Sequence, residues 1–131
     1  MILMDVNVLV YAFRRDMPDH GAYRAWLRDV VNGQEAYGLS ELVLSGFLRI
    51  VTNHKVFKHP STFAESSAFV ATVRQPDSCR IIAPGDRHWS IFLDLCRQAD
   101  AKGNLVADAY LAALAIESGS VWITTDRDYS R

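Results

Sequence analysis

The sequence predicts an α/β fold with a mostly parallel sheet. Short apolar runs of strand length alternate with longer segments whose apolar residues recur at helical spacing. Turn signals such as Asn32-Gly33, Pro84-Gly85 and Ser118-Gly119 separate these segments. Helices that join strands in this order make the strands parallel and cover the sheet. With 131 residues, half of them hydrophobic and 22% charged, the chain has the size of one domain with a substantial core.

The expected elements follow one another along the chain. A strand at residues 1–5 leads into a helix that starts near Asn7, whose side chain can cap it. Helical spacing covers residues 19–33, and a short strand at 36–39 precedes a helix capped by Ser40. The remaining pattern comprises a helical stretch from Pro60-Ser61 to Pro76, a strand at 80–83, a helix capped by Asp86, a helix at 105–117 and a strand at 121–124.

Composition excludes several classes of protein. The apolar runs are far shorter than the ~20 residues of a membrane-spanning helix, and the N-terminus lacks the basic region and cleavage site of an export signal. Cys79 and Cys96 are too few and too far apart for a disulfide framework or a zinc site. We therefore expect a cytoplasmic protein without membrane association. Since the net charge is −1, any nucleic acid would have to meet a local basic patch.

Three aspartates occur where parallel sheets concentrate functional side chains. Asp5 follows the first expected strand, Asp126 follows the last, and Asp108 lies in the expected first turn of a helix that is apolar on nearly all sides and should be buried. Taken singly, Asp108 and Asp126 also suit ordinary helix starts. Sites in such sheets form beyond the carboxyl ends of the strands, so the three carboxylates converge if the first and last strands are neighbours. Grouped carboxylates favour a hard cation, Mg²⁺ or Mn²⁺, and metal-dependent phosphodiester cleavage.

Three motifs connect these acids to a known family. They are D-V-N-V-L-V-Y at 5–11, V-A-D-A-Y-L-A-A-L-A at 106–115 and T-T-D-R-D-Y at 124–129, and with them the whole chain resembles a single PIN domain, residues 1–131. The segments G-F-L-R-I-V-T-N at 46–53 and K-V-F-K-H-P at 55–60 narrow the resemblance to the VapC toxins of bacterial toxin–antitoxin pairs. The family often continues with a short closing segment beyond the position where this chain ends.

The resemblance implies both a fold and an activity. The fold is a three-layer sandwich with a central, mostly parallel sheet of four or five strands. The activity is that of a Mg²⁺- or Mn²⁺-dependent endoribonuclease, acting on structured RNA such as tRNA or rRNA. A VapB-type antitoxin would neutralise the protein, which would be a homodimer. Residue by residue, the resemblance implies catalytic and metal-binding roles for Asp5, Asp108 and Asp126, with support from Asn7, Thr124 and Asp128.

The fourth acid of the family departs from its usual place. A helical glutamate is expected where this chain has Gly46, and the nearby acid is Glu41. A shift of five residues moves a side chain by about 7.5 Å along a helix and by about 140° around it. We expect Glu41 to act as the fourth catalytic acid, from the start of the helix or through water. The alternative is a first-turn glutamate that the helix dipole favours.

Basic and aromatic residues give further expectations. The candidate contacts to the RNA backbone are Arg14, Arg15, Lys55, Lys58 and Arg127, with solvated surface charge as the alternative. Arg49 interrupts an apolar helical pattern and should support the fold or pair with a buried acid. The histidines should lie at the surface or cap helices, and the three tryptophans should lie in the core.

Other functions fit fewer of these features. A haloacid-dehalogenase-like phosphatase expects D-x-D after the first strand, where this chain has Asp5-Val6-Asn7. A receiver domain expects paired acids at its start and a lysine after the last strand. A catalytically weakened module that binds RNA or antitoxin stays open, because glycine occupies position 46. A purely structural domain would leave the three aspartates unexplained.

Overall fold

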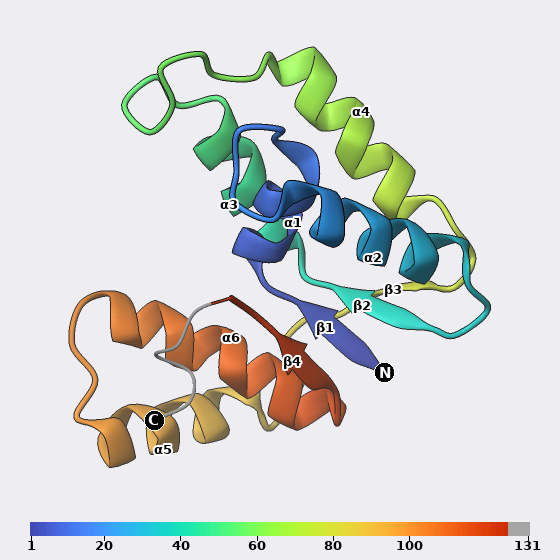
Figure 1. The fold of residues 1–131 in the computed structure, drawn as a ribbon. Helices are drawn as coiled ribbons and strands as arrows, with labels where there is room; N and C mark the ends of the chain where they lie inside the picture. Colours follow the sequence, from blue (N-terminus) through green and yellow to red (C-terminus); the bar gives the residue numbers. More distant parts are fainter. Residues whose placement is uncertain (126–131) are drawn as a thin grey trace.

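A parallel four-stranded sheet with helices on both faces forms the described part of the chain (Figure 1). The computed structural model describes residues 1–125. The strands β1 (Ile2–Met4), β2 (Tyr37–Leu39), β3 (Cys79–Ile81) and β4 (Val121–Ile123) lie in the order β3-β2-β1-β4. The helices are α1 (Val6–Phe13), α2 (His20–Asn32), α3 (Glu41–Val51), α4 (Phe63–Arg74), α5 (His88–Ala99) and α6 (Asn104–Ser118). Within residues 1–125, no helix has both the length and the apolar character to cross a membrane.

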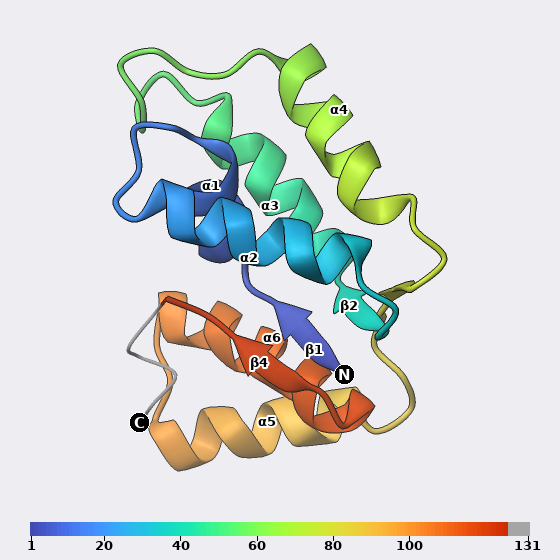
Figure 2. The ribbon, with the colours of Figure 1, turned by 45° about the vertical axis from the view of Figure 1, so that its right-hand side comes forward.

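Two neighbouring residues of β1 explain the three layers. Leu3 and Met4 are both fully buried, and they point to opposite faces because side chains alternate along a strand. Met4 belongs to the larger core with residues of α1, α2 and α3, whereas Leu3 packs against Leu114 and Ala115 of α6. Helices α1 to α4 therefore cover one face of the sheet, and α5 with α6 covers the other (Figure 2). The expected α/β sandwich with a parallel sheet is confirmed.

The strand register determines which residues meet at the carboxyl edge of the sheet. The central strand β1 pairs in parallel with β2 and with β4, and Met4 lies opposite Ile123. The backbone N–H of Asp5 donates to the Ile123 carbonyl at 2.9 Å, which extends this pairing by one residue. The first and last strands are thus neighbours, as the convergence of the aspartates requires.

Several helix starts differ from the sequence expectations. Asp5, not Asn7, is the N-cap of α1, and its carboxylate accepts from the N–H of Val6. Ser40 caps α3 as expected, through the N–H of Leu42. At α5, however, no side-chain cap forms at its N-cap residue, Arg87, and the expected Asp86 cap is wrong. A carboxylate from α6 replaces it, because Glu117 accepts from the backbone N–H groups of Gly85 and Arg87 at 2.7 and 2.9 Å.

Four expectations about burial are wrong. Helix α6 is not buried on nearly all sides, since Val106 is 38% and Ile116 53% exposed, because a single helix pair covers that face of the sheet. Trp89 of α5 is 62% exposed for the same reason. Arg49 lies exposed on α3 and not against a buried acid. His88 is buried, with its Nε2 2.9 Å from the carbonyl oxygen of Tyr110 and its ring against that tyrosine.

Candidate functional site

Asp5 is a buried carboxylate at the carboxyl end of the central strand. It is 3% exposed, and its extended backbone marks the point where β1 passes into α1. One carboxylate oxygen, Oδ1, accepts from the N–H of Val6 at 2.6 Å, and the other, Oδ2, accepts from the hydroxyl of Thr124 at 2.6 Å. Hydrogen bonds to both oxygens stabilise an ionised carboxylate in a place where water is largely excluded. The strand, the helix start and the neighbouring strand therefore hold this side chain in a fixed orientation.

Thr124 reaches Asp5 because of the register between β1 and β4. It follows Ile123, which lies opposite Met4, so the two polar residues occupy equivalent positions beyond the strand ends. The sequence placed Thr124 beside the site as a supporting residue, and its hydroxyl does donate to Asp5. Asn7 lies in the first turn of α1, partly buried and two residues beyond Asp5.

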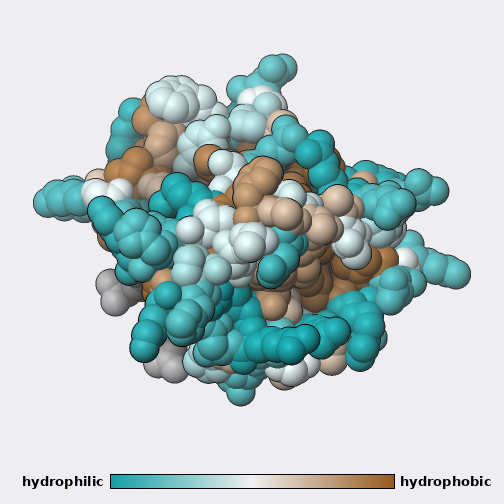
Figure 3. Space-filling view, turned by 90° about the horizontal axis from the view of Figure 1, so that it is seen from above, coloured by the Kyte–Doolittle hydropathy of each residue, from teal (hydrophilic) through white to brown (hydrophobic). Residues whose placement is uncertain are grey.

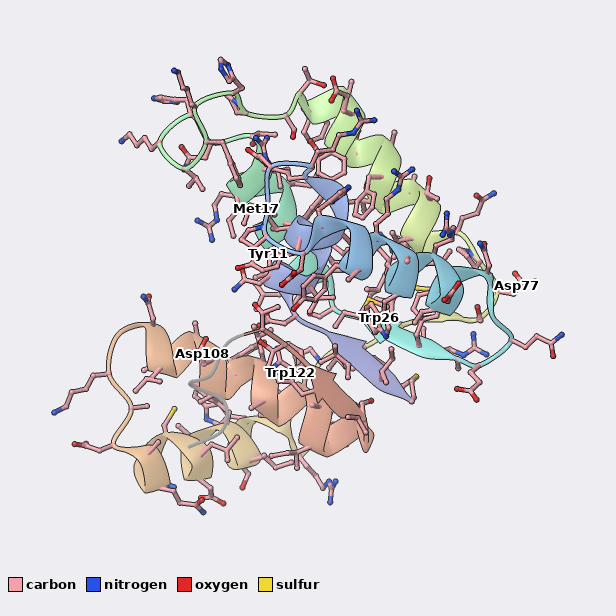
Figure 4. The ribbon with its side chains drawn as sticks, viewed as in Figure 1. Tyr11, Met17, Trp26, Asp77, Asp108 and Trp122 are labelled. Atoms are coloured by element: carbon pink, nitrogen blue, oxygen red, sulfur yellow. The ribbon has the colours of Figure 1, made fainter. Side chains whose placement is uncertain are left out.

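Asp108 lies on the helix that covers the other face of the sheet. It is partly buried and is the fifth residue of α6, so it belongs to the second turn and not to the expected first turn. Figure 4 shows it in the half of α6 that is nearer the helix start. Two of the three expected acids thus come from different layers. Asp5 lies at the carboxyl edge of the sheet, and Asp108 lies in the layer formed by α5 and α6.

The third acid, Asp126, lies outside the described residues, as do Arg127 and Asp128. Within residues 1–125, no three histidine, cysteine, aspartate or glutamate side chains lie close enough together to hold a metal ion. A site of three carboxylates in this chain would therefore require Asp126. In the sequence, that residue follows Thr124 by two positions.

The fourth acid has two candidate positions on α3, and they face different neighbours. Glu41 is exposed at the helix start and forms an ion pair with Arg74 at the end of α4, with 3.1 Å between Oε2 and Nη2. Gly46 faces α1 instead, since a Cβ at this position would lie 3.8 Å from the Val6 side chain. Val6 is the first residue of α1, so a side chain at position 46 would start beside the beginning of that helix.

The expected RNA-binding residues differ in how accessible they are. Arg15, Lys55 and Lys58 are exposed. The side chain of Arg14 is only 9% exposed, and its guanidinium binds Asp16, the hydroxyl of Ser61 and the face of Phe57. The hydrogen bonds from Arg14 hold the pKa of Asp16 below its ordinary value.

A groove of about 390 Å³ lies between α2 and the ends of α1 and α4, away from the aspartates. Its lining combines apolar side chains with a basic stripe on α2, formed by His20, Arg24 and Arg28. Figure 3 shows hydrophobic surface between hydrophilic side chains on the face that these helices share. The sequence expectations missed these residues, although their spacing of four places them on one side of a helix and was a usable signal.

Comparison with known proteins identifies the family. The model of the PIN domain matches residues 2–131. A VapC ribonuclease of Mycobacterium bovis is 41% identical over 131 residues, which cover 100% of this chain and 89% of that protein. Ribonuclease VapC25 of Mycobacterium tuberculosis is 38% identical over 131 residues, with 100% and 92% covered.

Solved structures share the fold at lower identity. VapBC2 from Rickettsia felis, bound to a DNA fragment from its promoter, aligns with a TM-score of 0.70 at 20% identity, covering 100% of this chain and 92% of that one. VapC20 of Mycobacterium tuberculosis, described as a toxin that cleaves the sarcin-ricin loop, aligns with a TM-score of 0.69 at 16% identity, covering 99% and 93%. The full-length matches in sequence, with a fold that agrees, show that this chain belongs to the PIN domain family, in its VapC group.

Proposed function

We propose that this protein is a metal-dependent endoribonuclease of the VapC type that hydrolyses phosphodiester bonds in structured RNA such as tRNA or rRNA. The observation that carries the proposal is the buried carboxylate of Asp5, fixed at the carboxyl edge of the sheet by Val6 and Thr124. Relatives named as ribonucleases, at 34–41% identity over the full chain, support the same activity.

The available side chains suit Mg²⁺ or Mn²⁺. Asp5, Asp108 and Asp126 offer oxygen atoms only, and hard divalent cations prefer such ligands. We propose these three as the catalytic and metal-binding residues, with Asn7, Thr124 and Asp128 in support. A bound cation would supply an activated water and would offset charge on the phosphate. The chain itself contributes the orientation of Asp5, because hydrogen bonds from Val6 and Thr124 hold both of its carboxylate oxygens.

Glu41 is our proposed fourth acid, and its ion pair makes the proposal specific. To serve the site, Glu41 would have to leave Arg74, an exposed pair of the kind that contributes about 0–1 kcal/mol. That cost is small enough for substrate or metal binding to offset. The substitution Glu41→Gln should weaken the response of cleavage to Mn²⁺. If the Mn²⁺ titration curves of this variant and of the parent protein superimpose, Glu41 does not belong to the site.

We further propose a cognate VapB-type antitoxin as the partner, with the protein acting as a cytoplasmic homodimer. The groove beside α2 supports such a partner, because its apolar lining and its basic stripe suit an amphipathic segment with acidic residues. Exposed apolar side chains at the starts of α3 and α4, Leu42 and Phe63, support contact with a second copy. Arg15, Lys55, Lys58 and Arg127 are the proposed contacts to RNA phosphates.

A cleavage assay tests the activity. Purified protein should cut tRNA or rRNA with Mg²⁺ or Mn²⁺ and should stop when EDTA is added. Asp5→Asn and Asp108→Asn should abolish cleavage, while the matched control Asp94→Asn, an exposed acid of α5, should cut like the parent. If the two site variants cut as well as the parent does, the proposed site is wrong.

A catalytically weakened module is the alternative that one observation favours, namely the glycine at position 46. In that case the protein would bind RNA or antitoxin and cleave little. A glutamate introduced at position 46 would distinguish a weakened module from a complete enzyme, because this position faces Val6 and has space for a Cβ. Gly46→Glu should increase cleavage strongly in a weakened module and only slightly in an enzyme that is already complete.

A further inference from the structure

We propose that the loop between α3 and α4, residues 52–62, is a preformed binding element for RNA phosphates and that Arg14 holds it in shape. The inference rests on the proposed function for the identity of its ligand, RNA, and explains how the chain presents the proposed contacts Lys55 and Lys58 to it. It also assigns Arg14 a different role from that of its exposed neighbour Arg15, because the guanidinium of Arg14 is largely buried and contacts Ser61 and Phe57 of the loop.

The charge of this region differs from that of the whole chain. Residues 42–64 contain no aspartate or glutamate, and they include Arg49, Lys55 and Lys58. With neutral histidines the segment carries a net charge of +3, although the net charge of the chain is −1. All three cationic side chains are exposed, as are His54 and His59. Such a local concentration of positive charge suits a polyanion, which the chain as a whole would not attract.

The backbone of the loop is ordered by its own hydrogen bonds. The carbonyl of Asn53 accepts from the N–H groups of Val56 and Phe57, both at 3.0 Å, and its side chain accepts from the N–H of Lys55 at 2.9 Å. The N–H of Ser61 then donates to the Val51 carbonyl at 2.8 Å, which returns the chain to the end of α3. Lys55 therefore projects from a closed turn and not from an extended linker.

Arg14 joins this loop to the end of α1. Its Nε and Nη2 atoms donate to the two carboxylate oxygens of Asp16 at 2.9 and 2.7 Å, and its Nη1 donates to Ser61 at 3.0 Å. The guanidinium also lies 3.8 Å from the centre of the Phe57 ring, within the range of a cation–π contact. Because Asp16 offsets the charge of Arg14, this arginine makes the loop more rigid and does not add to its attraction for RNA phosphates. Phe57 points inward as an anchor, which leaves Lys55 and Lys58 on the outside.

The loop lies on the same side of the sheet as Asp5. Helix α3 starts at the carboxyl end of β2, and its 11 residues extend about 16 Å from that edge. The loop follows the far end of α3, as Figures 1 and 2 show. An RNA that reaches the carboxylates can therefore extend along α3 to Lys55 and Lys58. A structured RNA is long enough to span that distance, whereas a dinucleotide is not.

Salt dependence of RNA binding tests the loop without any cleavage. We would measure binding of unfractionated tRNA to the full chain in EDTA, between about 50 and 200 mM salt. Lys55→Ala/Lys58→Ala should reduce the slope of log Kobs against log salt by about 1.4–1.8, because each lost phosphate contact contributes roughly 0.7–0.9. The matched control, Arg80→Ala/Arg97→Ala, removes the same charge from exposed positions on β3 and α5 and should leave the slope nearly unchanged.

A second variant tests the role of Arg14. Arg14→Gln/Asp16→Asn removes the ion pair without changing net charge, and it should weaken tRNA binding several-fold while the salt slope stays the same. If the slope falls by about 0.8, Arg14 is itself a phosphate ligand and its positioning role is overturned. If the lysine variant leaves the tRNA slope unchanged but no longer binds poly-L-glutamate, the loop serves an acidic protein and the proposal is wrong. If the protein binds tRNA as expected but shows no metal-dependent cleavage, the proposed activity is overturned and the proposed role of the loop is not.

Discussion

Gly46 provides a direct test of how α3 packs against the start of α1. It lies in the interior of the helix, where glycine costs about 0.5–1 kcal/mol relative to alanine because its unfolded backbone has more freedom. A Cβ at this position would lie 3.8 Å from the Val6 side chain, an ordinary van der Waals contact. Gly46→Ala should therefore stabilise the protein by about 0.5–1 kcal/mol, without strain.

Gly119 is the matched control, because the same substitution there should have the opposite sign. Among residues 1–125, no heavy atom outside the neighbouring backbone lies within 4 Å of a Cβ at Gly119, so the described part of the chain leaves space for it. Its φ is +66°, however, in the left-handed region that ends α6. A side chain in that region costs about 1–2 kcal/mol. Gly119→Ala should therefore destabilise the protein even though the added methyl group clashes with none of residues 1–125.

Urea unfolding of the metal-free protein measures both effects. The midpoint should rise for Gly46→Ala and fall for Gly119→Ala, with no change in the slope m, since neither variant alters the surface exposed on unfolding. In a thermal scan, a gain of about 1 kcal/mol corresponds to roughly 3–5 °C for a chain of this size. A loss of stability in Gly46→Ala would refute the packing of α3 against the start of α1, and with it the placement of position 46 beside Val6.

Three further substitutions test individual side chains. Asp108→Asn should raise the melting temperature without metal because it removes repulsion between carboxylates, and a clear decrease would contradict a cluster. Glu117→Gln should lower stability at neutral pH, because the N–H of Gly85 above all holds the pKa of Glu117 below its ordinary 4.5. Since the folded pKa is the lower one, this difference should be complete above pH 4.5 and disappear as the pH falls through the folded value. A difference that persists in acid would contradict the assignment. Tyr37→Phe should cost about 1–3 kcal/mol in urea unfolding, because the Val73 carbonyl loses its donor. Burial raises the pKa of Tyr37 from 10.0 to about 12, so its contribution should be complete below pH 10 and decline through pH 12. Equal stability of Tyr37→Phe and the parent at pH 7 would count against this hydrogen bond.

The sequence predicted which strand ends lie side by side in the sheet. Asp5 follows a short apolar run, and parallel neighbours bring such a position close to the end of the adjacent strand. The place of Thr124 was implied by the family resemblance, and its hydroxyl donates to Asp5. The role of Asp5 as a helix cap was not predicted, because Asn7 offered an equally good cap two residues later. Only the observed backbone, extended at residue 5 and helical from residue 6, decides between them.

The expectations that proved wrong depend on contacts far apart in the sequence. His88 has no local signal for burial, since its partner, the Tyr110 carbonyl, lies 22 residues away. The start of α5 is stabilised by Glu117, about 30 residues away, and not by the nearby Asp86. The apolar pattern of α6 indicates that the helix could be buried around most of its circumference. How much of that surface is actually buried depends on the number of helices that pack beside it in the layer. One helix, α5, was not enough to cover Ile116.

The position of the fourth acid shows why residue type and spacing cannot settle a site alone. Glu41 has the right chemistry, and the start of α3 is close to the carboxyl edge of the sheet, yet its partner in the structure is Arg74. Position 46 has the right neighbour, Val6, and lacks the carboxylate. If Glu41 serves the site, breaking its ion pair should help: Arg74→Ala should then increase cleavage at limiting Mn²⁺, whereas a bystander Glu41 predicts no change. An increase that disappears in Glu41→Gln/Arg74→Ala would assign the effect to the released carboxylate and not to the lost positive charge.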